Sequence, residues 1–287
     1  MDIFGSSNKR SHEAAAVITG AGSGIGAAFA AELARRCGKV VRSDVDESAA
    51  RTTADGIVAA GGEALEVHCD VARLDDVVQL SEFAQDWFAG PPTLVINNAG
   101  VGAGGTAIGE TDIDDWTWVL GINLWGPIHG CHVFAPILRE AHYGGIINVV
   151  SAAAFSAAPG MAAYNVSKAC LLSLSETLAA ELSGTGVHVT ALCPTLVKTN
   201  IVESARITDR STQWAGRLMR WTGFSPDRVA RTLPGHPGSR RPVLHAATGC
   251  PNRLGDQAFH PDGVYPRRRS LHAYDHLGGS RWRSTWT

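Results

Sequence analysis

Six short apolar runs alternate with longer amphipathic stretches over the first 232 residues, and this alternation is the strongest constraint on the fold. The runs are rich in Val and Ile, as is typical of strands buried on both faces. They are Ala14–Thr19, Lys39–Ser43, Ala64–Cys69, Thr93–Asn97, Gly145–Val150 and Val187–Cys193. Candidate helices lie between them, at residues 24–37, 46–60, 73–89, 111–140 and 160–183. Strict alternation predicts an α/β fold with a single doubly wound parallel sheet and helices on both faces.

The first apolar run leads into a glycine-rich segment, Thr19-Gly20-Ala21-Gly22-Ser23-Gly24-Ile25-Gly26, which opens the first helix. Glycines let the backbone turn tightly and let a diphosphate approach it closely. The helix N-terminus adds unpaired N–H groups and a partial positive charge. A plain strand–helix turn is the alternative meaning of these glycines. The strand–turn–helix context favours a Rossmann-type dinucleotide site that includes Gly20, Ser23, Gly24, Ile25 and Gly26.

An acidic residue, Asp44, ends the second predicted strand. A carboxylate there accepts hydrogen bonds from the adenosine ribose and repels a 2′-phosphate. Ser23 brings no positive charge to the glycine segment. Arg42, two residues before Asp44 on the same strand face, is the one feature that favours NADP. The sequence therefore predicts NAD as the cofactor, with NADP as the alternative.

Two further strand ends carry polar residues next to the predicted cofactor. Asp70 and Val71 follow the third strand, where Asp70 is placed to bond the adenine amino group. The segment Asn97-Asn98-Ala99-Gly100 ends the fourth strand, where Asn and Gly allow a sharp turn and side-chain amides can tie neighbouring strands. We expect contacts with the cofactor from Asp70, Val71, Asn97, Ala99 and Gly100.

A tyrosine and a lysine, Tyr164 and Lys168, stand four residues apart and therefore share one face of a predicted helix. A neighbouring ammonium favours the phenolate and lowers the tyrosine pKa from about 10. Tyr164 can then take or give the proton of an alcohol. Ser151, at the end of the fifth strand, is placed to hold and polarise the substrate oxygen. Taken alone, the Tyr–Lys spacing more often marks a surface pair.

The glycine segment, Asn97–Gly100, Ser151 and the Tyr164–Lys168 pair together resemble the short-chain dehydrogenase/reductase family, from about Ala14 to Thr199. The resemblance implies that Asn123 binds a water linking Lys168 to solvent. It also implies that Lys168 bonds the nicotinamide ribose and that Tyr164 contacts the cofactor. After the sixth strand, residues 193–200 resemble the family's Pro-Gly-x-x-x-Thr segment, which assigns Pro194, Val197 and Thr199 to the nicotinamide end. Thr195 replaces the usual Gly and adds a Cβ there.

The resemblance also places a substrate lid at about residues 200–224. Apolar residues of the lid and of its surroundings indicate a hydrophobic secondary alcohol or ketone as substrate. These are Ile201, Val202, Ile207, Trp214, Leu218, Met219, Trp221 and Phe224, with Phe155 and Met161 beside the Ser–Tyr pair. The alternative is that they only pack the lid on the sheet. The family pairs the helices at 111–140 and 160–183, which implies a homodimer or homotetramer.

Other sequence features point away from other classes of protein. His129 and His132 have no further metal ligand nearby, so we expect no metal site. Arg267–Arg269 is a short run without aromatic residues, so we expect no nucleic-acid partner. No apolar run reaches the roughly 18 residues of a membrane span, and the first residues lack the apolar core of a secretory signal. Six scattered cysteines are typical of reduced thiols and indicate a cytoplasmic protein.

Residues 233–287 differ in composition from the rest of the chain. They contain eight Arg, no Lys and three Asp, a net charge of +5, against −7 for residues 1–232. We therefore expect an N-terminal extension at 1–13, a catalytic domain at 14–232 and an atypical tail at 233–287. A last helix from Ser225 to about Leu233 should precede a seventh strand, but no strand pattern follows it. The final edge strand is expected to be missing or altered.

The tail composition is what a GC-rich gene yields when it is read out of frame. A frame change is our hypothesis for the tail. A disordered basic tail or a short extension is the alternative. A protein that binds a dinucleotide without turnover is a further alternative, since a missing edge strand would impair assembly.

Overall fold

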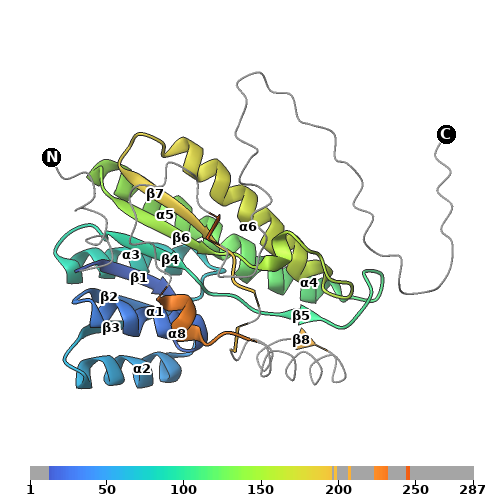
Figure 1. Cartoon of the computed structure of the whole chain (residues 1–287), viewed down its shortest axis with the longest axis horizontal. Coiled ribbons are helices and arrows are strands. Elements are labelled where there is room, and N and C mark those ends of the chain that lie inside the picture. Colours follow the sequence, from blue (N-terminus) through green and yellow to red (C-terminus); the bar gives the residue numbers. More distant parts are fainter. Residues whose placement is uncertain (1–12, 196, 199–205, 208–222, 232–243, 246–287) are drawn as a thin grey trace. The chain divides into compact units, whose positions relative to one another are not determined.

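The computed structural model describes residues 13–195, 197–198, 206–207, 223–231 and 244–245 of the chain (Figure 1). The chain divides into two units, Met1–Cys250 and Pro251–Thr287. All described residues belong to the first unit. The predicted extension at 1–13 and the predicted tail therefore lie almost entirely outside the described residues.

A single parallel sheet forms the centre of this unit, with strand order β3-β2-β1-β4-β6-β7-β9. Its strands are β1 (Ala15–Thr19), β2 (Lys39–Asp44), β3 (Glu63–His68), β4 (Leu94–Asn97), β6 (Gly144–Val149), β7 (Val187–Leu192) and β9 (Leu244–His245). In the middle of the sheet Val17 pairs with Val41 on one side and Val95 on the other. The six predicted strands are confirmed, each to within one residue at either end.

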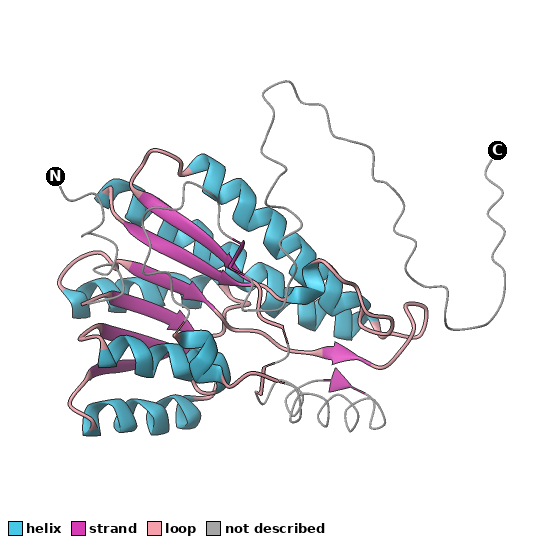
Figure 2. Ribbon diagram, in the orientation of Figure 1, coloured by secondary structure: helices cyan, strands magenta, loops and turns pink. Residues whose placement is uncertain are grey.

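Helices cover both faces of the sheet (Figure 2). Ala16 and Ile18 of β1 pack into one core with α1 (Gly24–Arg35), α2 (Glu47–Ala59) and α8 (Pro226–Ala230). Val17, between them, packs into the opposite core with α3 (Leu74–Phe88), α5 (Gly126–Ala141) and α6 (Ala162–Glu181). This alternation buries both faces of the strands. The predicted doubly wound α/β fold is confirmed.

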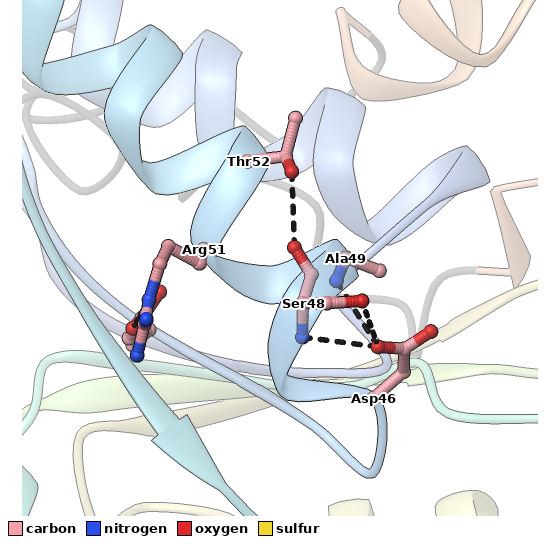
Figure 3. A network of polar contacts seen from close by, with 6 residues as sticks. Asp46, Ser48, Ala49, Arg51 and Thr52 are labelled. Carbon is pink, nitrogen blue, oxygen red and sulfur yellow. Dashed lines mark hydrogen bonds and ion pairs between the residues drawn. The ribbon is translucent and has the colours of Figure 1, made fainter.

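Local capping fixes where two of these helices begin. The Asp46 carboxylate accepts hydrogen bonds from the N–H groups of Ser48 and Ala49, at 3.0 and 3.1 Å, and from the Ser48 hydroxyl at 2.7 Å (Figure 3). This N-cap lies two residues after the end of β2, and α2 begins at the next residue, Glu47. Ser225 caps α8 in the same way, with Pro226 in the first turn. That helix ends at Ala230, and Leu233, its predicted end, lies outside the described residues.

The helix expected at 111–140 is interrupted. It consists of α4 (Ile113–Leu120), a π-helical turn η1 (Gly121–Trp125) and α5. A π-turn contains one more residue than an α-turn and therefore changes the direction in which its side chains point. Asn123 lies in this turn and is fully buried. Its side-chain amide makes two hydrogen bonds with the backbone of Val101. Oδ1 accepts from the Val101 N–H and Nδ2 donates to the Val101 carbonyl, both at 2.8 Å.

Two short pairings were not predicted from the sequence. Leu244 and His245 form β9, which pairs in parallel with Ala191 and Leu192 at the edge of the sheet. The final edge strand, expected to be missing or altered, consists of these two residues among those that the structure describes. A second small sheet joins β5 (Ala103–Gly104) to β8 (Arg206–Ile207). Such short strands have no apolar periodicity that a sequence pattern could reveal.

A buried chain of polar side chains crosses the core. Asn97 Nδ2 of β4 donates to Asn148 Oδ1 of β6 at 2.8 Å, and Asn148 Nδ2 donates to Ser175 Oγ of α6 at 2.9 Å. Gly130 of α5 lies directly over Asn97, because a Cβ built on Gly130 would lie 2.1 Å from Asn97 Oδ1. The helix can approach the sheet this closely only because residue 130 has no side chain.

We predict that Gly130→Ala destabilises the protein by about 1–3 kcal/mol, since overpacking against a tied side chain outweighs the gain in helix propensity. Gly56→Ala in α2 is the matched control. A Cβ there meets nothing within 4 Å, so we expect it to stabilise by about 0.5–1 kcal/mol. Urea denaturation of both variants measures the two signs. A stabilised Gly130→Ala protein would contradict the close packing.

Candidate active site

The predicted site residues gather at the carboxyl ends of the parallel strands. The strand order reverses between β1 and β4, because β1 leads outward to β2 and β3 while β4 leads to β6 and β7. In doubly wound sheets such a reversal leaves a crevice that binds ligands. The glycine segment follows β1, Asn97–Gly100 follow β4 and Ser151 follows β6.

Hydrogen bonds fasten the glycine segment to the turn after β4. Thr19 Oγ1 accepts from the N–H groups of Asn98 and Ala99, both at 3.1 Å. Asn98 Nδ2 donates to the carbonyls of Thr19 and Gly20, both at 2.9 Å. Gly20 has a φ of 64°, and a Cβ on it would lie 2.6 Å from the Ala99 Cα. Thr19 and Asn98 were absent from the predicted site, although both lie inside its motifs.

The N-terminus of α1 is built to receive an anion. Ser23 is the N-cap, but its side chain makes no capping hydrogen bond, and the first turn contains no acidic residue. Gly26 lies against the loop, since a Cβ there would lie 2.3 Å from the Gly20 carbonyl oxygen. The backbone N–H groups of this turn therefore suit a diphosphate, as predicted for Gly24, Ile25 and Gly26.

Asp44 and Arg42 both bond to the glycine segment. Asp44 Oδ2 accepts from the Gly22 N–H at 2.8 Å, and Oδ1 accepts from the Asp46 N–H at 3.1 Å. The Arg42 side chain is fully buried, and its Nη2 donates to the Ala21 carbonyl. The interpretation of Arg42 as a residue that favours NADP assumed a guanidinium open to a ligand. In the structure that guanidinium is instead hydrogen-bonded to the glycine segment.

The third and fourth strand ends are placed differently from one another. Asp70 Oδ1 accepts from the Ala72 N–H at 3.0 Å, and Asp70 itself is half-buried. Val71 is buried, and its carbonyl bonds to His129 Nδ1 at 2.9 Å. The Asn97 side chain belongs to the buried polar chain between β4 and β6. Only the backbone of Asn97 remains for a ligand.

Ser151, Tyr164, Lys168 and Asn123 come together beside the turn after β4. The Ser151 hydroxyl lies close enough to Tyr164 to affect its pKa, and it accepts a hydrogen bond from the Ala153 N–H at 3.2 Å. Lys168 Nζ lies 5.8 Å from the centre of the Tyr164 ring and donates to the Val149 carbonyl at 2.9 Å. A Cβ built on Gly100 would lie 3.3 Å from Asn123 Oδ1 and 3.6 Å from Lys168 Nζ.

Burial dominates the ionisation of this group. It raises the pKa of Tyr164, and the neighbouring Ser151 hydroxyl lowers it to a smaller extent. The expected net lowering of this pKa is wrong, because desolvation by burial is the largest effect on Tyr164 and raises it. Burial also lowers the pKa of Lys168 from 10.5 to about 8, while the neighbouring Cys193 raises it slightly.

The segment after β7 closes the site on one side. The Pro194 carbonyl accepts from the Ala152 N–H at 2.9 Å, which joins it to the residues after Ser151. Val197 is buried and bridges to Phe224, whose carbonyl accepts from the Lys198 N–H at 2.9 Å. Thr195, which replaces the family's glycine, is half-buried. Thr199 lies outside the described residues.

Part of the predicted apolar pocket is described. Phe155 is exposed, whereas Met161 and Phe224 are half-buried. Ile207 lies in β8, and the remaining predicted lid residues lie outside the described ones. Within the described ranges no three His, Cys, Asp or Glu side chains are grouped to hold a metal ion. No described helix is both long and apolar enough to cross a membrane.

The lowered pKa gives a direct test of the buried lysine. We predict that the ¹³Cε signal of Lys168 titrates with a midpoint near pH 8. The chain contains only four lysines, so the absence of the signal in Lys168→Met assigns it. Between pH 8 and about 10.5 the unfolded chain keeps a proton that the native protein has lost, so wild-type stability should rise relative to Lys168→Met. A midpoint above pH 10 would contradict the burial.

The comparison with known proteins matches this geometry. The family model described as short chain dehydrogenase covers residues 14–210. A 1-deoxy-11-beta-hydroxypentalenate dehydrogenase of Streptomyces arenae is 35% identical over 85% of this chain and 86% of its own length. The probable oxidoreductase EphD of Mycobacterium tuberculosis is 35% identical over 80% of this chain. This chain spans only 40% of the length of EphD.

Solved structures show the same relationship. A short chain dehydrogenase/reductase from Burkholderia phymatum, in complex with NAD, aligns with a TM-score of 0.72 at 38% identity, over 75% of this chain and 82% of that one. A 3-ketoacyl-(acyl-carrier-protein) reductase from Brucella melitensis, complexed with NADH, aligns with a TM-score of 0.68 at 28% identity, over 77% and 89%. With its doubly wound sheet and the grouping of Ser151, Tyr164 and Lys168, the chain belongs to the short-chain dehydrogenase/reductase family.

Proposed function

We propose that this protein is an NAD-dependent alcohol dehydrogenase or ketone reductase that uses Ser151, Tyr164, Lys168 and Asn123. The observation that carries the proposal is the placement of the Ser151 hydroxyl next to the Tyr164 side chain, with the buried Lys168 ammonium 5.8 Å from the tyrosine ring. The Ser151 and Tyr164 hydroxyls can both bond to one substrate oxygen, and the Lys168 cation lies next to the tyrosine. This arrangement suits the reduction of a carbonyl group to an alcohol.

The residues that would hold NAD fit it. The α1 N-terminus and its glycines would take the diphosphate, Asp44 the adenosine ribose and Asp70 the adenine. Val71, Ala99 and Gly100 line the same turns, and Pro194, Val197 and Thr199 belong to the segment expected at the nicotinamide end. When bound, the nicotinamide ring accepts or supplies the hydride. Relatives of known structure bind NAD or NADH, which supports this cofactor.

The protein side chains handle the proton. In the reducing direction Ser151 holds the carbonyl oxygen while Tyr164 donates its phenolic proton to it. With its pKa raised, the phenol carries the proton that this direction needs at neutral pH. Lys168, with a pKa near 8, is mostly cationic at neutral pH and stabilises the phenolate that remains. The Asn123 side chain fixes the turn beside Lys168 through Val101.

We propose a hydrophobic secondary alcohol or ketone as the substrate. Exposed Phe155 and half-buried Met161 and Phe224 flank the Ser–Tyr pair and the segment after β7. Relatives are named for a hydroxypentalenate, a hydroxypropyl-CoM and an oxoacyl carrier protein, so small molecules with an alcohol or carbonyl group are common to them. A cytoplasmic homodimer or homotetramer, paired through the helices at 111–140 and 160–183, completes the proposal.

One observation bears on each of two alternatives. An NADPH-dependent carbonyl reductase would need a cation open to the 2′-phosphate, and the burial of Arg42 argues against it. A catalytically impaired dinucleotide-binding protein is favoured by the edge strand β9, which has only two residues. Turnover by the purified protein separates this second alternative from the proposal.

Tyr164→Phe tests the proton donor. We predict that it lowers kcat by about 10²–10⁴-fold, because no other group replaces the phenolic proton. Binding of NAD should persist, since the glycine segment is unchanged. The matched control is Tyr143→Phe, which alters an exposed tyrosine just before β6, at the opposite end of the sheet. Absorbance at the reduced nicotinamide band follows turnover. A Tyr164→Phe enzyme that reduces a good ketone substrate at the wild-type rate would exclude the mechanism.

Asp44 tests the choice of dinucleotide. We predict that the wild-type protein binds NAD at least tenfold more tightly than NADP, because the carboxylate accepts the ribose hydroxyls and repels a phosphate. Asp44→Ser should weaken NAD and strengthen NADP, which narrows the ratio. Calorimetric titration with each dinucleotide measures the four dissociation constants. Tighter binding of NADP by the wild-type protein would refute the role given to Asp44.

A further inference from the structure

Arg42 carries a buried charge that the proposed reaction does not use. Its side chain is fully buried in β2, two residues before Asp44. Burial lowers the pKa of the guanidinium, while the carboxylates of Asp44 and Glu66 raise it. Burial of a cation is costly unless hydrogen bonds and opposite charges compensate for it. The position of those compensating groups indicates what the charge does.

One peptide group of the glycine segment is held at both ends. The carbonyl of Ala21 accepts a hydrogen bond from Arg42, and the N–H of the next residue, Gly22, donates to Asp44 Oδ2 at 2.8 Å. The Ala21 N–H donates to the Ser43 carbonyl at 3.0 Å. Because a peptide group is planar, a hydrogen bond at each end fixes the orientation of its plane. Three consecutive residues of β2 therefore set the start of the loop.

The same peptide group orients Asp44. A Cβ built on Gly22 would lie 2.8 Å from Asp44 Oδ2, so the loop backbone rests directly on the carboxylate. The second oxygen of Asp44 accepts from the Asp46 N–H. A carboxylate oxygen can accept more than one hydrogen bond, so each Asp44 oxygen can also accept one from a ligand hydroxyl. The nearby guanidinium also offsets the carboxylate's negative charge.

We propose that Arg42 is a positioning residue for the adenosine end of the dinucleotide. By holding the Ala21 carbonyl, it fixes the Ala21–Gly22 peptide group and, through Gly22, the Asp44 carboxylate that receives the ribose hydroxyls. This inference rests on the proposed function, because it assigns Arg42 to the same dinucleotide site. A guanidinium suits the task because it is rigid, always charged and longer in reach than an ammonium.

The test uses the full chain with NAD and ADP-ribose as probes in calorimetric titrations. Arg42→Met should weaken both by about tenfold or more, as expected for loss of a hydrogen bond from a charged group. In turnover assays the KM for NAD should rise by a similar factor while kcat at saturating NAD and the KM for the alcohol stay within about twofold. Lys39→Met is the matched control, since it removes an exposed cation from the amino end of the same strand.

Arg42→Lys keeps the test decisive if Arg42→Met fails to fold. It retains the charge but is shorter than arginine. Its dissociation constant for ADP-ribose should therefore lie between the wild-type value and a value about tenfold higher. In a double-mutant cycle with Asp44→Asn, the combined loss should be smaller than the product of the two single losses, because both side chains hold one peptide group.

The outcomes separate the two proposals. A wild-type protein that binds neither NAD nor ADP-ribose removes the proposed function and the inference with it. A wild-type protein that binds both, with Arg42→Lys or folded Arg42→Met indistinguishable from Lys39→Met, overturns the inference and leaves the proposed function in place. Fully independent losses in the cycle would also overturn it.

Discussion

The buried chain from Asn97 through Asn148 to Ser175 is the interaction on which the placement of the candidate active site depends. It connects β4, β6 and α6 beside the apolar core between the sheet and its helices, and α5 packs over it at Gly130. Polar groups that are bonded to one another in a low-dielectric interior specify one arrangement, since any shift leaves a buried donor or acceptor without a partner. Because α6 carries Tyr164 and Lys168, this chain fixes their distance from the sheet.

The π-turn at Gly121–Trp125 sets the orientation of the Asn123 side chain. It lets Asn123 face Val101 and Ser167 from a helix whose neighbouring turns pack against other surfaces. The turn after β4 is thus held from both sides, by Asn123 on one and by Thr19 on the other. Lys168 lies beside this turn, so the proposed catalytic and nucleotide halves of the site share one piece of backbone.

The sequence predicted the parts of this arrangement that repeat or that combine in a motif. Strand positions followed from runs of Val and Ile, and Ser151, Tyr164 and Lys168 from their order and spacing. What could not be predicted depends on tertiary burial. The direction of the Tyr164 pKa shift comes from desolvation, which no spacing reveals. The guanidinium of Arg42 is hydrogen-bonded to Ala21 in the loop that covers it, a contact that only the folded chain creates. The strand β9 is too short to carry a sequence pattern. The π-turn likewise has no apolar period of its own.

The close contacts around Gly20 have a consequence for protein engineering. A Cβ on Gly26 would strike the Gly20 carbonyl and the Asn98 amide, and one on Gly20 would strike Ala99, so two segments almost eighty residues apart fit each other atom to atom. The shape of the glycine segment is therefore not a property of its own eight residues. If the segment were transferred alone to another scaffold, its glycines would remain flexible and its present backbone conformation would be lost. It becomes portable only when the turn after β4 is moved together with it, in the same parallel register.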